Sequence, residues 1–181
     1  DSASRGLGDV YKRQLYLFFI TLRDFFNKKY KNFAQNTAHF GFSLLILSIL
    51  FNNLFSSEII TNLKVGETYD NSKTKIVFES INQKKEKNYK SIIANFNITN
   101  SEGINNNLSP ELRIYNQPNI TTSEADIKTT LMKDKFIVIN LVQNQDYFNV
   151  RYQVKPFMLW IWLSVIMISL GGLVSFLQRR T

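Results

Sequence analysis

The chain has 181 residues, no cysteine, one histidine and a formal net charge of +8. Without cysteine, it has no disulfide, no thiol nucleophile and no attachment site of its own for a c-type haem. One histidine without cysteine also argues against a zinc site or a Ser–His–Asp triad, so we assign no catalytic residue.

The N-terminal 35 residues predict two short pieces. Residues 1–14 begin without methionine and lack the layout of a signal peptide, so we interpret them as a fragment edge or sequencing artefact. Residues 15–35 open with the apolar run Leu15–Leu22, which is too short to span a membrane. We expect it to be the end of a truncated membrane helix, followed by a basic cytoplasmic loop.

Residues 36–55 predict a transmembrane helix. They read NTAHFGFSLLILSILFNNLF and carry no charged residue. Roughly twenty residues that rise 1.5 Å each cross a hydrocarbon core about 30 Å thick, and a helix satisfies its own backbone there. His39 is a strongly polar side chain near the start of this span and is therefore the first functional lead.

Residues 56–155 predict a small all-β domain. Apolar and polar residues alternate in Ile76–Asn82 and Tyr89–Thr99, with a hairpin tip at Gln83–Asn88. Further strands are expected at Glu111–Tyr115, Ala125–Thr130, Phe136–Val142 and Tyr147–Val154. This spacing indicates an antiparallel sandwich or a barrel-like fold. Its expected core is Ile76, Phe78, Ile93, Phe96, Ile98, Ile137, Ile139 and Val150.

Charged motifs in this domain have plain interpretations. The run Lys84–Lys90 is either a basic-aromatic patch for nucleic acid or a solvated hairpin tip, and we favour the tip and expect no nucleic-acid partner. Glu111 and Arg113 share a strand face and predict an exposed ion pair of little energetic consequence. Glu124 and Asp126 predict a solvated turn.

Residues 156–178 predict the second transmembrane helix. Pro156 suits the first turn of a helix, and Phe157, Trp160 and Trp162 suit the outer membrane–water interface. Gly171 and Ser175 form a small-xxx-small pair that favours close helix packing. We therefore expect further membrane helices besides these two.

The distribution of charge predicts the orientation. Basic residues precede the first span, and Arg179 and Arg180 follow the second, within the short tail 179–181. The positive-inside rule then places both termini in the cytoplasm and the β-domain on the far side. In a two-membrane bacterium, whose inner membrane the spans would cross, that side is the periplasm. The expected fold is two transmembrane α-helices that flank a small all-β extracytoplasmic domain.

Several short runs occur in a characteristic order. They are Ala38–Gly41, Asn88–Tyr89, Leu108–Tyr115, Thr122–Ile127, Pro156–Leu163, Gly171–Gly172 and Arg179–Arg180. Together they resemble the C-terminal part of the cytochrome c-type biogenesis protein CcmF family, from about Leu15 onwards. One departure is Phe148, where the family has a tryptophan ahead of the position of Arg151.

The resemblance implies handling of haem. Such proteins take haem from a CcmE-like chaperone and, with CcmH- and CcmI-like subunits, join it to apocytochrome c as a haem lyase subunit. They hold haem b between histidines of membrane helices, and only the Ala-His-x-Gly histidine maps here, onto His39, as one axial ligand of the haem iron. The family's tryptophan-rich motif and other histidines are absent. We therefore expect a C-terminal fragment with no complete catalytic site, whose second haem ligand lies outside it.

Two alternatives remain for His39 and for the chain. His39 is either a haem ligand, which the resemblance favours, or an interfacial histidine whose tip reaches water. As a ligand, it could be oriented by Asn36 or Thr37. Gly41 has no side chain to obstruct a nearby porphyrin, although it lies off the face of the helix that His39 occupies. The chain is otherwise a non-haem membrane scaffold whose β-domain docks a periplasmic partner. The same residues also fit an NrfE-like paralogue dedicated to one multihaem cytochrome.

Overall fold

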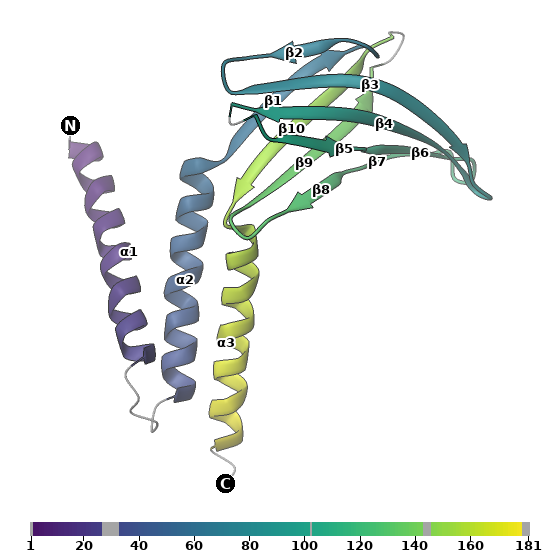
Figure 1. Ribbon diagram of the computed structural model, residues 1–181. Coiled ribbons are helices and arrows are strands. Elements are labelled where there is room, and N and C mark those ends of the chain that lie inside the picture. The colour runs from purple at the N-terminus through teal and green to yellow at the C-terminus, as the bar shows by residue number, and fades with distance from the viewer. Residues whose placement is uncertain (1, 27–32, 102, 143–145, 179–181) are drawn as a thin grey trace. The chain divides into compact units, whose positions relative to one another are not determined.

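The computed structural model describes residues 2–26, 33–101, 103–142 and 146–178. The chain forms two compact units, coloured along the sequence in Figure 1. The helical unit comprises Asp1–Ser56, Thr130–Lys133 and Lys155–Thr181, and the β-domain comprises Ser57–Thr129 and Asp134–Val154. The short segment Thr130–Lys133 therefore belongs to the helical unit, although it joins two strands.

The helical unit contains three helices: α1 (Ser2–Phe26), α2 (Phe33–Phe55) and α3 (Met158–Gln178). Among the described helices, α2 and α3 are the two that are long and apolar enough to cross a membrane. Both predicted spans are thus helical. The helix α1 runs without interruption through residue 14, and our interpretation of residues 1–14 stays a prediction.

The helix α2 begins at Phe33, three residues before the predicted start at Asn36. His39 is consequently the seventh residue of the helix and not part of its first turn. At 1.5 Å per residue, it lies about 9 Å along the axis from Phe33. His39 thus lies about two turns into the candidate span.

Two glycines allow close contact between α2 and α3. A Cβ atom added at Gly171 would lie 2.7 Å from the carbonyl oxygen of Ala34 and 2.8 Å from the Cβ atom of Ala38. A Cβ atom added at Gly41 would lie 3.0 Å from the Cβ atom of Met167. Small residues let membrane helices approach in this way. Gly171 therefore packs against the other predicted span, and the existence of further membrane helices stays a prediction.

The helix α3 begins at Met158, two residues after the predicted start at Pro156. Pro156 ends the last strand, and Phe157 has a φ of 60°, which no right-handed helix contains. A bulky residue adopts this conformation only where its surroundings hold it there. Here the Phe157 ring lies 5.2 Å from the Phe51 ring, and the side chain of Asn52 donates a hydrogen bond of 2.6 Å to the carbonyl of Pro156.

The β-domain consists of two antiparallel sheets, which confirms the predicted sandwich. The four-stranded sheet has the order β1-β10-β9-β8, with β1 (Ser57–Leu63), β10 (Phe148–Pro156), β9 (Lys133–Leu141) and β8 (Asp126–Thr129). The larger sheet has the order β2-β3-β4-β6-β7, with β2 (Thr68–Asp70), β3 (Thr74–Lys85), β4 (Tyr89–Asn100), β6 (Glu111–Tyr115) and β7 (Thr121–Glu124). The remaining strand, β5 (Asn105–Leu108), pairs with β4.

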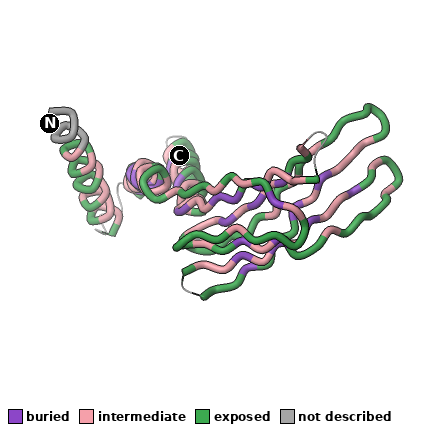
Figure 2. Tube along the Cα trace, turned by 90° about the horizontal axis from the view of Figure 1, so that it is seen from above, coloured by how far each residue is buried: buried purple, intermediate pink, exposed green. Residues whose placement is uncertain are grey.

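The core lies between the two sheets and follows the expected alternation, which Figure 2 shows as buried and exposed stretches along the strands. Seven of the eight predicted core residues are buried: Ile76, Phe78, Phe96, Ile98, Ile137, Ile139 and Val150. The prediction for Ile93 is wrong. Successive residues of a strand point to opposite faces, so Ala94, Phe96 and Ile98 share the inner face of β4 and Ile93 lies on the outer one.

A β-bulge in β3 changes which residues face the core. The register with β4 shifts between Phe78 and Ser80. Phe78 packs inwards, and beyond the bulge the next residue packed against the core is Ile81. A bulge places one extra residue in a strand and so reverses the alternation after it. This is why the continuation of the strand towards Lys85 presents its odd-numbered residues to the inner face.

Candidate functional site

His39 lies on an exposed stripe of α2. Two other faces of this helix are occupied. Phe40 stacks on Phe25 of α1 at 5.1 Å between ring centroids, and the hydroxyl of Ser43 lies 2.5 Å from that of Thr21. Ala38 and Gly41 face α3. Between these two faces, helical spacing places six residues on one stripe: Gln35, His39, Phe42, Ile46, Ile49 and Asn53.

The stripe combines one imidazole with apolar surface. Gln35, His39, Phe42, Ile49 and Asn53 are exposed in the described part of the chain, and Ile46 is half-buried. Beyond Phe42, the stripe and Gln14 of α1 line a groove of about 270 Å³. No hydrogen bond or ion pair engages the His39 ring among the described residues, so its ring nitrogens are available to a ligand. A neutral imidazole with apolar neighbours suits the axial position of a haem iron.

The side chains predicted to support His39 have other partners in this structure. Thr37 donates its hydroxyl to the carbonyl of Phe33 at 2.8 Å, and Asn36 donates its amide to the carbonyl of Asp24 at 2.8 Å. Neither side chain orients the imidazole in this structure. Gly41 faces α3 and so lies off the face that His39 occupies, as expected. Its lack of a side chain serves helix packing.

Other metal ligands do not gather in the described residues. Within these ranges, no group of three or more His, Cys, Asp or Glu side chains could hold a metal ion. If His39 binds a metal, the described residues form no such group around it.

In the β-domain, Arg113 of β6 pairs with two glutamates, one on its own strand and one on β7. Its guanidinium lies 3.0 Å from Glu111 and 3.6 Å from Glu124, and 5.3 Å from the centre of the Tyr89 ring. The hydrogen bond from Arg113 lowers the pKa of Glu111 and, in return, raises the pKa of Arg113. The Glu111–Arg113 pair, which was predicted to be exposed, is partly buried. Glu124 also pairs with Arg113. Asp126 accepts a hydrogen bond of 2.6 Å from the backbone of Ser109.

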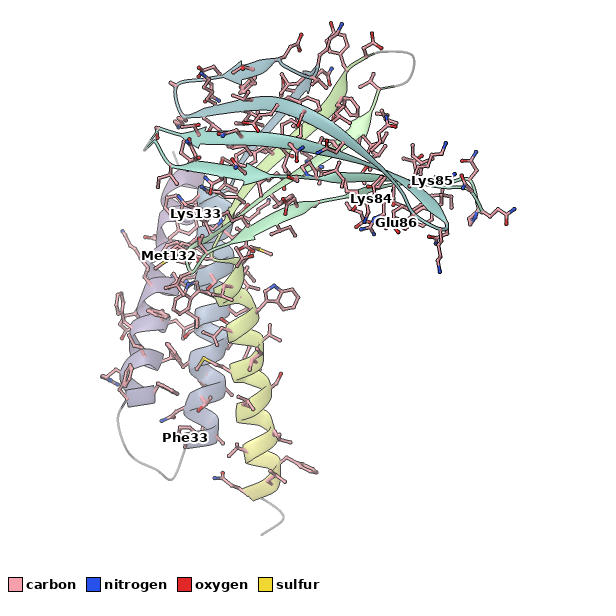
Figure 3. All side chains as sticks on the ribbon, turned by 45° about the vertical axis from the view of Figure 1, so that its right-hand side comes forward. Phe33, Lys84, Lys85, Glu86, Met132 and Lys133 are labelled. Carbon is pink, nitrogen blue, oxygen red and sulfur yellow. The ribbon has the colours of Figure 1, made fainter. Side chains whose placement is uncertain are left out.

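The end of the β3–β4 hairpin forms a basic hollow. Figure 3 labels Lys84, Lys85 and Glu86 at this end of the hairpin. The hollow has a volume of about 430 Å³ and is lined by Gln83, Lys84, Lys85, Lys90, Ser91, Ile92 and Ile114. We call these residues the lysine hollow. Ile92 and Ile114 join the edge of the core, so the hollow has an apolar side as well as a charged one.

Electrostatics within the lysine hollow favour an anion. Lys85 and Lys90 are direct cross-strand partners, and like charges opposite each other destabilise a strand pair. Lys84 bonds Glu86 at 2.7 Å, and the hydrogen bond with Glu86 raises the pKa of Lys84. Among the described residues, Lys85 and Lys90 make no ion pair. The lysines of the Lys84–Lys90 run are exposed, as expected of a solvated hairpin tip, and Lys84, Lys85 and Lys90 among them also line this hollow.

Comparison with known proteins gives a consistent result. The model of the CcmF C-terminal β-sandwich matches residues 54–156, which is more than half of the chain. The cytochrome c-type biogenesis protein CcmF of Haemophilus influenzae is 27% identical over 143 residues, covering 79% of this chain and 22% of that protein. CcmF of Escherichia coli shows the same identity and coverage. NrfE of Haemophilus influenzae is 23% identical over 92% of this chain and 26% of its own length.

A solved structure named cytochrome c haem lyase CcmF shares the fold. Its TM-score is 0.63 at 15% identity, over 88% of this chain and 28% of that one. The chain thus spans about a quarter of the proteins that it matches. The β-sandwich between two membrane helices and the match over residues 54–156 together confirm the resemblance noted in the sequence, and the chain belongs to the CcmF family.

Proposed function

We propose that this chain is the C-terminal part of a cytochrome c maturation protein and that His39 is an axial ligand of its haem b. One observation carries the proposal. The chain's only histidine lies about two turns into a membrane helix, on an exposed stripe between the faces that pack against α1 and α3. A polar side chain in this place is costly to bury and is usually retained for a function.

The chain's own residues would bind and shield the haem. His39 would donate an imidazole nitrogen to the iron, while Phe42 and Ile46 on the same stripe would contact the porphyrin and exclude water. Gln35 lies one turn before His39 and is therefore nearer the N-terminal end of α2. When bound, haem supplies an iron that exchanges single electrons. A second axial ligand would come from outside this sequence, since His39 is its only histidine.

The proposal includes a location and partners. The membrane would be a bacterial inner membrane, with both termini in the cytoplasm and the β-domain in the periplasm. Basic residues that flank the spans support this orientation. The partners would be a CcmE-like haem chaperone, CcmH- and CcmI-like subunits and apocytochrome c. The names of the relatives, all cytochrome c-type biogenesis proteins, support this setting.

The test is His39→Ala in the full-length protein. Alanine removes the iron bond without hindering insertion, because it is easier to bury than imidazole. We expect a normal protein level, lost or shifted b-haem absorbance and impaired cytochrome c maturation, with partial recovery of absorbance on adding imidazole. Gln35→Ala, on the same stripe, is the matched control and should keep its haem. An unchanged haem spectrum with full maturation in His39→Ala would contradict the ligand role.

A second role is supported by the lysine hollow. We propose that it docks a partner-protein segment that combines carboxylates with an apolar side chain. Carboxylates would relieve the repulsion between Lys85 and Lys90, and the apolar side chain would cover Ile92 and Ile114. This docking role holds whether or not the chain binds haem.

Charge reversal tests this role. Lys85→Glu with Lys90→Glu should abolish salt-sensitive capture of purified CcmE-, CcmH- or CcmI-like domains by the detergent-solubilised chain. Lys75→Glu with Lys128→Glu makes the same change in net charge at exposed positions outside the hollow and should bind like the parent. Equal loss in both double variants would show that net charge, and not the hollow, governs capture.

A further inference from the structure

The turn between β8 and β9 has an unusual composition for its position. Its residues are Thr130–Lys133, and the two central ones, Leu131 and Met132, are 61% and 53% exposed. The turn is closed locally, since the amide of Thr130 donates to the carbonyl of Lys133 at 3.0 Å and the hydroxyl of Thr130 does so at 2.6 Å. Exposed turns are normally polar. Two adjacent large apolar side chains at the tip therefore need an explanation.

The same turn is bound to the start of α3. The indole nitrogen of Trp160 donates to the carbonyl of Leu131 at 2.9 Å, and the amide of Phe157 donates to the carbonyl of Met132 at 2.8 Å. Figure 3 labels Met132 and Lys133 in this turn. Both central carbonyls are thus hydrogen-bonded to the helix start, while the side chains of Leu131 and Met132 stay exposed.

The position of this helix start defines the surroundings of the turn. The helix α3 is one of the two membrane spans among the described helices, and it begins at Met158. The first turn of a span lies where hydrocarbon meets the headgroups, and tryptophan is enriched at that depth. Trp160 is in this first turn, and Trp162, two residues on, is 64% exposed. A turn that is hydrogen-bonded to Trp160 lies at the same boundary.

We infer that the turn Thr130–Lys133 is a lipid anchor, in which Leu131 and Met132 enter the headgroup–acyl boundary of the leaflet at the N-terminal end of α3. Apolar side chains gain free energy by leaving water there. Lys133, next to Met132, and Lys155, before the helix, place ammonium groups where lipid phosphates lie. The anchor is independent of haem and of which side of the membrane carries the β-domain.

The chain has no cysteine, so a single one can report on the turn. Met132→Cys, labelled with an environment-sensitive fluorophore in the full chain, is placed in vesicles of phosphatidylcholine and phosphatidylglycerol. Quenching is measured with nitroxide-bearing lipids and, separately, with aqueous iodide. Ile104→Cys is the control because Ile104 is 52% exposed and belongs to the β-domain. Leu131→Cys serves as the second reporter if Met132→Cys does not fold.

The anchor predicts several-fold stronger quenching by nitroxide lipid at position 132 than at position 104, and weaker quenching by iodide. Nitroxide quenching no stronger than at position 104, together with strong iodide quenching, would place the turn in water and overturn the inference. Protection from both quenchers would overturn it as well, because a segment of protein would then cover the turn.

Discussion

Tyr152 is a residue whose side chain sets a pH dependence for the β-domain. It lies in β10 with 2% of its surface exposed, and its hydroxyl has no hydrogen-bond partner within the described part of the chain. Burial raises the pKa of Tyr152 to about 12, because the phenolate would lose its hydration. The folded state therefore favours the neutral phenol. This contribution to stability is fully present below the unfolded pKa, near 10, and is lost as the pH rises from about 10 to 12.

Tyr152→Phe removes a hydroxyl that the fold does not satisfy. We expect the free energy of unfolding at neutral pH to rise by about 1 kcal/mol, because a buried polar group without a partner costs that order of free energy. Above pH 10, the advantage of the variant should grow, since it has no phenol to ionise. Denaturant unfolding at a series of pH values measures both effects.

The control for this prediction is Tyr69→Phe. The hydroxyl of Tyr69 accepts a hydrogen bond from Asn71 at 3.4 Å, so its removal should bring no gain. A lower free energy of unfolding in Tyr152→Phe would mean that the Tyr152 hydroxyl is satisfied, for instance by water.

At the scale of elements, the contact between α2 and α3 rests on Gly171. A side chain there would meet the backbone of Ala34 and Ala38 at 2.7–2.8 Å, and backbone cannot move aside as a flexible side chain can. The neighbouring Gly172 has no atom within 4 Å of an added Cβ. A side chain would thus clash at Gly171 and find open space at the adjacent Gly172.

Gly171→Val should therefore separate the two spans and lower stability by about 1–3 kcal/mol, the usual cost of overpacking. Gly172→Val makes the same chemical change one residue away and should leave stability close to that of the parent. Thermal unfolding of both variants in detergent is the measurement. Equal behaviour of the two variants would show that the contact at Gly171 is unimportant for the pair of helices.

At the scale of the whole molecule, the orientation in the membrane decides whether the proposed chemistry is possible. Haem is joined to apocytochrome c outside the cytoplasm, so the β-domain has to be there for the proposed role. The charged residues before the first span are mostly basic, and two arginines follow the second span.

Fusions of alkaline phosphatase test this orientation, because the enzyme is active only outside the cytoplasm. A fusion at Asn105 in the β-domain should be active, and a fusion after Thr181 should be inactive. The two fusions serve as each other's control for expression. The reverse pattern would contradict the orientation and the proposed function together.

The sequence by itself determined the features that depend on short-range patterns. A continuous apolar run is enough to identify a span, which is why both α2 and α3 were predicted. Strand alternation identified the β3–β4 hairpin and most of the core, because the period of two is a local property. Ile93 was wrong because its parity conflicts with Phe96 and Ile98 on the same strand. His39 stood out since it is the chain's only histidine and lies in a span.

Other features were decided by contacts between residues distant in sequence. The strand β1 was missed although Ile59, Ile60 and Thr61 favour a strand. Its pairing with β10, with Ser57 opposite Val154, joins residues that are far apart in the sequence. The start of α3 depends on the positive φ of Phe157, which packing against Phe51 supports.

The surroundings of the functional residues were also beyond the sequence. Asn36, Thr37 and Gly41 are next to His39 in the chain, yet helix geometry directs them to other partners. Leu131 is held at the start of α3 by a hydrogen bond from Trp160, 29 residues away, which no local pattern predicts. Local periodicity sets which residues share a face of a helix or strand, but only tertiary packing decides which of those faces is covered.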